Sequence, residues 1–301
     1  MVIPIIVNLS FLGNTNKNIG DAFLLVWKLP DSELENRING LAVKRSKLVR
    51  SICDLSMLSF VKILIRLTFK QKILQYSSNP HLNDRLPNFK VKMGFGLHMG
   101  WAIEGAIGSE YKIDASYLSP NVNIAARLEA ATKQYGVQLL ISDKIHEFCS
   151  KKCKNILRAI DIVTVKGSIN PLGLFTADFK ENEEGTTYQK EEGQTGHKIK
   201  KNFLTEMVEN DQFKPGRYID ADRLLKTLLI QSDREIQFKN SFKLGFDHYI
   251  GGKWDLSKKW LDESLILKPN DGPTMTLRKF IEKFEFVAPK DWKGYRELTE
   301  K

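Results

Sequence analysis

The chain of 301 residues is poor in cysteine, and its three cysteines cannot supply the disulfide framework of a small secreted domain. It also lacks an uninterrupted run of about 18 apolar residues, the length that a membrane-spanning helix needs. Its most apolar stretch, residues 55–69, is broken by two basic side chains. The first residues are apolar but lack the basic start and the small-residue cleavage site of a signal peptide. We therefore expect a cytoplasmic protein in a reducing compartment.

Acidic residues are absent from the first 20 positions, and the first carboxylate of the chain is Asp21. The whole chain is basic, with a formal net charge of +10 at pH 7. Such a charge attracts anions, which include nucleotides, nucleic acids and acidic membrane surfaces. The lysines are spread along the chain rather than interleaved with aromatic residues, so we expect no nucleic-acid partner.

A small group of metal-ligand types, His146, Cys149 and Cys153, follows in a lysine-rich segment. No second cluster accompanies it to complete a tetrahedral ligand set, so a structural metal is not expected here. The cysteines therefore indicate neither disulfide nor metal chemistry.

The clearest local signal is a helix that begins after Ser119. Ser119 can cap it, Pro120 suits its first turn, and Gly136 suits a left-handed end. The apolar residues recur at the spacing of a buried stripe: Ile124, Leu128, Ala131 and Tyr135. Asn123 and Arg127 are four residues apart and so project from one face. An amide and a guanidinium fork on one face can bind phosphate oxygens, although such a pair taken alone is more often part of a solvated surface helix.

Strand patterns surround this helix. Apolar runs predict strands at 19–27, 91–98, 101–107, 137–142, 160–165 and 172–177, and a helix at 143–153. Gly100 lies between the second and third of these runs, which predicts a hairpin there. The order predicts an α+β fold, with a mostly antiparallel sheet and helices on one face.

The rest of the chain divides by composition. Residues 31–88 have a loose helical period and predict an insert, either packed on the domain or lying on a membrane surface. Residues 178–215 are polar and charged, as in a linker, and separate the first unit, 1–177, from a helical region at 216–301. That last region contains one pattern of the 34-residue tetratricopeptide (TPR) unit: Gly245, Ser257, Leu261, Ser264 and Pro269. Its helices either pack on their own domain or form a surface for a protein partner.

Four short motifs occur in a fixed order in the first half of the chain. They are KNIGDA at 17–22, GLHMG at 96–100, the segment 114–127 and VKG at 165–167. With these motifs, residues 14–177 resemble the catalytic domain of class III adenylate/guanylate cyclases. The resemblance implies a ferredoxin-like sheet and active sites at the interface of a homodimer or of a heterodimer with another cyclase chain.

The resemblance also implies roles for individual residues in the reaction. The family joins the ribose 3′-hydroxyl to the α-phosphate of a nucleoside triphosphate, with two Mg²⁺ or Mn²⁺ ions held by two aspartates. Asp21 matches the second of these aspartates. Asn123 matches the residue that orients the ribose, and Arg127 the residue that stabilises charge on the α-phosphate.

Three further positions match substrate-binding residues of the family. Lys17 matches the residue that reads the purine, where a lysine fits adenine N1 and a glutamate fits guanine. Ser116 matches its partner for the purine amino group, because a hydroxyl can still offer an acceptor. Lys166 matches the lysine that contacts the phosphates. ATP is therefore expected as substrate in preference to GTP.

The chain departs from the family pattern in two places. The first metal-binding aspartate of the family lies in a Phe-x-Asp strand, which residues 1–20 do not contain, so the first strand and helix of the domain are expected to be missing. One carboxylate cannot neutralise two divalent ions. In addition, residues 119–121 read Ser-Pro-Asn where the family commonly has Gly-x-Thr.

Three functions remain open from the sequence. The first is an adenylate cyclase subunit in cyclic-nucleotide signalling, which completes its site with a partner. The second is a non-catalytic nucleotide-binding module that regulates an active cyclase. The third is a scaffold that binds a protein partner through residues 216–301.

Overall fold

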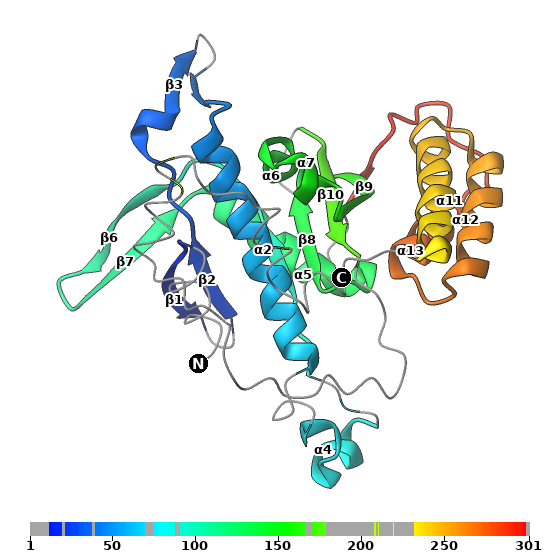
Figure 1. Ribbon diagram of the computed structural model, residues 1–301, viewed down its shortest axis with the longest axis horizontal. Helices are drawn as coiled ribbons and strands as arrows, with labels where there is room; N and C mark the ends of the chain where they lie inside the picture. The colour runs from blue at the N-terminus through cyan, green and yellow to red at the C-terminus, as the bar shows by residue number, and fades with distance from the viewer. Residues whose placement is uncertain are drawn as a thin grey trace.

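A computed structural model describes residues 12–19, 22–37, 40–69, 75–87, 89, 91–165, 170–178, 208, 210, 219 and 232–298. Its centre is a five-stranded sheet in the order β11-β9-β10-β8-β5 (Figure 1). The strands are β5 (Phe95–Leu97), β8 (Leu139–Ser142), β9 (Leu157–Thr164), β10 (Leu172–Ala177) and β11 (Arg296–Glu297). β10 runs antiparallel to β8 and β9, whereas the outer pairs, β5–β8 and β11–β9, are parallel.

Three antiparallel hairpins lie outside this sheet. They are β1 (Asn14–Ile19) with β2 (Ala22–Val26), β3 (Leu34–Arg37) with β4 (Gly40–Val43), and β6 (Ile103–Ser109) with β7 (Lys112–Leu118). The hairpin predicted at Gly100 is wrong, because β5 pairs with β8 and β6 pairs with β7. The apolar run of β8 offers β5 a fully buried neighbour, while β6 and β7 need only a local turn.

Helices cover both faces of the central sheet. Alternate residues of β8 point to opposite sides, since Leu139 and Ile141 belong to one hydrophobic cluster and Leu140 to the other. The expected helical face holds α5 (Pro120–Tyr135). The other face holds α2 (Lys47–Phe69), so helices lie on both faces rather than on the one face predicted, and the predicted insert supplies the second layer.

The insert is packed into the core. It contains η1 (Asp31–Glu33), the β3–β4 hairpin, α2 and α4 (Pro80–Arg85), so it is only partly helical. Leu55, Met57 and Leu58 of α2 are fully buried. Trp27, just after β2, packs edge-on against Phe60 of α2, with 5.6 Å between ring centroids. This burial favours the packed insert over a helix on a membrane surface, and no described helix has the length and apolarity that crossing a membrane requires.

The helix predicted at 143–153 is in fact two short helices, α6 (Asp143–Phe148) and α7 (Lys151–Lys154). The break lies at Ser150, whose side chain caps α7 by accepting from the Cys153 amide. The Ser150 amide donates in turn to the buried carboxylate of Asp54 on α2, at 2.9 Å. A contact between distant segments therefore ends the first helix.

The C-terminal helices pack directly on the central sheet. They are α11 (Asp233–Ile250), α12 (Trp254–Leu267) and α13 (Gly272–Glu282), and Figure 1 shows them beside β9 and α5. Trp254, Tyr249 and Leu277 share one hydrophobic cluster with Leu128 of α5 and Ile160 of β9. The α+β fold with a C-terminal helical region is thus confirmed, and these helices use an apolar face within the chain. The TPR-like assignment stays a prediction, and most of the predicted linker lies outside the described residues.

A buried ion cluster joins the two regions. Arg158 of β9 donates to Asp178 at 2.8 and 2.9 Å, and to Asp271, the residue before α13, at 2.8 and 3.2 Å. Its guanidinium also lies over the rings of Phe238 and Phe242 of α11, at 4.9 and 4.2 Å. Arg158 therefore has carboxylate partners for its charge and its N–H groups, and aromatic rings against its guanidinium, all within the interface between the sheet and the C-terminal helices.

The three cysteines are free and buried, and we expect them to resist thiol reagents while the protein is folded. Burial, followed by the nearby Asp54, raises the pKa of Cys53 to about 12, and the pKa values of Cys149 and Cys153 are raised as well. A protonated, inaccessible thiol is a poor nucleophile. A colorimetric thiol titration should detect almost no thiol in buffer and three in denaturant. Fast reaction of even one thiol in buffer would contradict this burial.

His146 stacks on Phe175, with 3.9 Å between ring centroids. No metal-binding cluster of His, Cys, Asp or Glu occurs in the described part of the chain.

Candidate active site

The helix α5 forms as its sequence predicts. Ser119 accepts a hydrogen bond from the Asn121 amide at 3.0 Å, Pro120 is in the first turn, and Gly136 ends the helix with φ of 64°. The predicted stripe is buried at Leu128, Ala131 and Tyr135. Asn123 is exposed and Arg127 is half-buried, so both lie outside the buried stripe. The helix therefore presents an amide and a guanidinium one turn apart.

The structure brings Lys17 and Ser116 together, although 99 positions separate them in the sequence. The Lys17 ammonium on β1 donates to the Ser116 hydroxyl on β7 at 2.7 Å. It donates equally to the Asp114 carboxylate, also at 2.7 Å. The Asn16 amide adds a bond to the Ala115 carbonyl at 3.2 Å. A cation, a hydroxyl and a carboxylate therefore meet where the β1–β2 and β6–β7 hairpins touch.

Asp114 is the member of this cluster that sequence reasoning assigned no role. The signal was its position two residues before Ser116, because such residues share a face of a strand. The carboxylate is an acceptor only, so it orients Lys17 and can also accept from an amino group. Lys17, Asp114 and Ser116 together offer both a donor and acceptors to a purine edge.

A second ion pair connects the same two hairpins. Lys28, just after β2, donates to Glu104 of β6 at 2.7 Å, and Tyr117 donates to Glu104 at 2.8 Å. The hydrogen bond from Lys28, followed by that from Tyr117, lowers the pKa of Glu104. Tyr117 alternates with Ser116 along β7, which places this pair on the opposite face of the hairpin. It therefore supports the hairpin contact without joining the Lys17 cluster.

His98 holds the segment that precedes α5. Its Nδ1 lies 2.9 Å from the Ser142 hydroxyl and its Nε2 lies 3.2 Å from Oδ1 of Asn121. The Asn121 side chain also donates to the Trp101 carbonyl at 2.9 Å. Burial lowers the pKa of His98, against the opposing effect of Asn121, so the ring is neutral at pH 7. This network fixes the start of the helix on which Asn123 and Arg127 lie.

Two predicted site residues, Asp21 and Lys166, lie outside the described residues. The fit of the divalent ions that the family resemblance implies must therefore be judged on the remaining donors. Within the described ranges no group of three or more His, Cys, Asp or Glu side chains is placed to hold a metal ion. Asp114 is already engaged by Lys17. The described donors alone therefore do not form a two-ion site.

The comparison with known proteins identifies the family. Residues 14–188 match the adenylate and guanylate cyclase catalytic domain, which is more than half of the chain. The chain belongs to this family. The match begins at β1, which contains Lys17, and continues through the segment that contains Ser116, Asn123 and Arg127.

Individual relatives are adenylate cyclases. The chain is 33% identical over 87 residues to an adenylate cyclase of Anabaena cylindrica, covering 29% of this chain and 17% of that protein. It is 27% identical over 165 residues to the terminal-differentiation-specific adenylate cyclase of Dictyostelium discoideum, covering 54% and 6%. The matches thus span less than a fifth of each relative. A solved bacterial light-regulated adenylyl cyclase is 22% identical with a TM-score of 0.40, covering 58% of this chain and 41% of that one.

Proposed function

We propose that this chain provides the ATP-binding part of an adenylate cyclase site, which converts ATP to cyclic AMP and diphosphate. The main observation is the cluster of Lys17, Asp114 and Ser116, followed along the chain by the helix with Asn123 and Arg127. Adenine offers an acceptor at N1 and a donor at its 6-amino group, which the lysine and the carboxylate or hydroxyl complement. The adenylate cyclases among the relatives support this substrate over GTP.

The chemistry assigned to the chain's own residues is binding and charge stabilisation. The ribose 3′-oxygen bonds to the α-phosphorus, the bond from that phosphorus to the bridging oxygen breaks, diphosphate leaves and the hydroxyl proton passes to solvent. Asn123 orients the ribose through its amide. The Arg127 guanidinium, with Lys166, donates to phosphate oxygens where negative charge develops.

The site is completed by a second chain, which is either a copy of this one or another cyclase domain. Another cyclase domain would also supply the carboxylates for Mg²⁺ or Mn²⁺. The β6–β7 hairpin, which projects from the rest of the molecule in Figure 1, favours such a partner. Ile103 and Leu118 are paired directly across it and are 61% and 62% exposed. They share a strand face with Asp114 and Ser116, so a partner that covers this apolar pair also closes over the polar cluster.

The proposal is tested by incubating the purified chain with ATP and Mn²⁺, alone and with a catalytically competent cyclase domain from the same organism. Cyclic AMP above the partner's own background is expected in the mixture and should disappear with Arg127→Ala. If neither incubation gives cyclic AMP above the partner's own background, but calorimetry shows that the chain binds a non-hydrolysable ATP analogue, a regulatory nucleotide-binding module is favoured instead. The observation behind this second function is the cluster of Lys17, Asp114 and Ser116, which can bind a purine whether or not turnover follows. Absence of both turnover and binding rejects both.

Replacing Asp114 with asparagine should raise the KM for ATP about tenfold, because a charge-assisted hydrogen bond to Lys17 is lost. The KM for GTP should change less, which reduces discrimination between the purines. The matched control is Glu104→Gln, which disrupts the Lys28 pair on the opposite face of the same hairpin. Equal effects of the two substitutions would show that Asp114 supports only the hairpin contact.

A further inference from the structure

The end of α5 meets the beginning of α13, far from the Lys17 cluster. A Cβ added to Gly272 would lie 2.1 Å from the Tyr135 carbonyl oxygen, so the two helix ends are in direct contact. The Thr276 hydroxyl donates to the Gln134 carbonyl at 3.2 Å. Asn123 and Tyr135 are separated by about 18 Å along the helix axis, at a rise of about 1.5 Å per residue. This junction is therefore distinct from the candidate active site.

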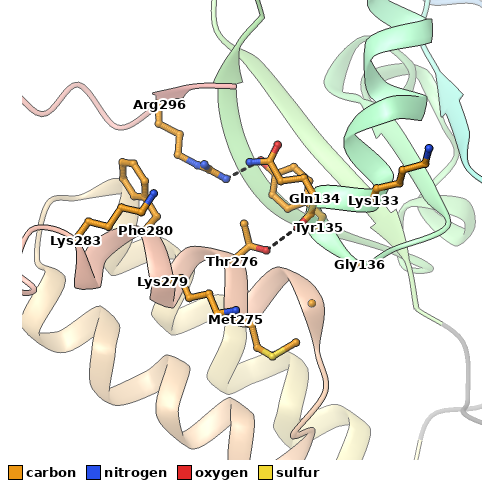
Figure 2. A pocket seen from close by; sticks show the side chains of 11 residues that line it. Lys133, Gln134, Tyr135, Gly136, Met275, Thr276, Lys279, Phe280, Lys283 and Arg296 are labelled. Carbon is orange, nitrogen blue, oxygen red and sulfur yellow. Dashed lines mark hydrogen bonds between the residues drawn. The ribbon is translucent and has the colours of Figure 1, made fainter. Parts of the chain in front are cut away.

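A pocket of about 350 Å³ lies beside this contact (Figure 2). The side chains that define it are Tyr135, Met275, Lys279, Phe280, Lys283 and Arg296. Its volume is at the lower end of the range for small-molecule sites. It has apolar surface from Met275 and Phe280, so its size and lining suit a small organic molecule rather than a bare ion.

The charged groups around the pocket are all basic. None of its described lining residues is Asp or Glu. Arg296 is neutralised from beneath, because its Nε donates to the buried Asp161 at 2.8 Å and its Nη2 donates to the Tyr135 hydroxyl at 3.1 Å. Lys133 also lines the pocket, but its ammonium points away from α13 in Figure 2.

Lys279 and Lys283 therefore account for the uncompensated charge. Lys279 is in the last turn of α13, and Lys283 is the residue that caps the end of this helix, four positions later. Like charges four residues apart on a helical turn repel each other. Neither has a carboxylate partner within the described residues. The neighbouring Arg278, in contrast, pairs with Asp262 and Glu282. An anion bound in the pocket would be attracted by both of these charges.

We propose that this pocket binds a small organic phosphate, with its phosphoryl group at Lys279 and Lys283 and its apolar part against Met275 and Phe280. A phosphoryl group matches the site because it bears up to two negative charges and several acceptor oxygens. Because the ligand contacts α13 next to the end of α5, it strengthens the contact between the C-terminal helices and the cyclase domain. This site does not depend on the proposed cyclase function.

The test is calorimetric titration of the full chain at constant ionic strength, with AMP, diphosphate, inorganic phosphate and sulfate as separate probes. We expect saturable binding of AMP or diphosphate, and about a tenfold or greater loss of affinity in Lys279→Glu/Lys283→Glu. The matched control is Lys259→Glu/Lys290→Glu, which makes the same charge change at exposed lysines outside the pocket and should bind normally. Lys279→Gln/Lys283→Gln removes the charges without reversing them and should also weaken binding.

Three outcomes would overturn the proposal. They are no saturable binding of any probe, equal affinity of the pocket and control variants, and equal affinity for sulfate and the phosphates. Thermal melts establish that each variant is folded. Asp114→Asn changes the candidate active site alone and should leave binding at the pocket intact. Failure of the pocket proposal would appear in the binding titrations, whereas failure of the cyclase proposal would appear in the cyclic AMP assay.

Discussion

Replacing Arg158 with alanine should lower the free energy of unfolding by about 3–5 kcal/mol, the usual cost of removing one partner from a buried ion pair. The Arg158 side chain is 6% exposed, and it neutralises Asp178 and Asp271 inside the interface. Burial opposes its charge, but the two carboxylates prevail and raise the pKa of Arg158. Without it, Asp178 keeps Lys239, at 3.7 Å, as a cationic partner. Asp271 keeps the hydrogen bonds from Thr274 but loses the guanidinium that pairs with it. Urea unfolding followed by circular dichroism measures the change.

Arg278 provides the matched control. It also pairs with two acids, Asp262 and Glu282, but at the surface, where such pairs contribute at most about 1 kcal/mol. Arg278→Ala should therefore shift the urea midpoint only slightly. If Arg158→Ala costs no more than Arg278→Ala, the ion cluster does not hold the C-terminal helices to the sheet, and apolar packing alone does so.

The elements that the sequence predicts well are those with local signals. The helix at 120–135 has its cap, its proline, its buried stripe and its terminal glycine within 18 residues, and each acts as expected. The pairing of Lys17 with Ser116 has no local signal at all. It followed from the family resemblance alone, and the structure places the two side chains in contact.

The errors arise where distant segments decide the structure. Nothing near Gly100 shows that β5 pairs with residues 139–141 rather than with the strand that follows it. The helix at 143–153 is interrupted because Asp54, almost 100 positions earlier, accepts from the Ser150 amide. The apolar patterns do not predict strand β7, because its polar residues, Asp114 and Ser116, face the Lys17 cluster instead of a core. A functional strand therefore lacks the apolar alternation by which strands are recognised.

Replacing Gly96 with alanine should both destabilise the protein and reduce any cyclase activity about 100-fold. Gly96 is in β5, and a Cβ there would lie 2.1 Å from the Ala125 carbonyl oxygen and 2.5 Å from the Glu129 amide nitrogen, both in the backbone of α5. A backbone cannot rotate away as a side chain does, so the helix must shift. Overpacking of this kind costs about 1–3 kcal/mol. The shift moves Asn123 and Arg127, and a displacement of about 1 Å in positioning groups can reduce a rate by about 100-fold.

Gly105→Ala separates this effect from the loss of a strand glycine in general. Gly105 lies in β6, and an added Cβ there meets nothing within 4 Å. Its variant should unfold at the same urea concentration as the parent and keep its ATP kinetics. The urea midpoint reports stability and the ATP kinetics report positioning. The two effects are separated because activity is measured without urea, where both variants are fully folded. A folded Gly96→Ala protein with unchanged kcat would contradict this prediction. It would show either that the packing of α5 on β5 does not position Asn123 and Arg127, or that these two residues do not act in the reaction.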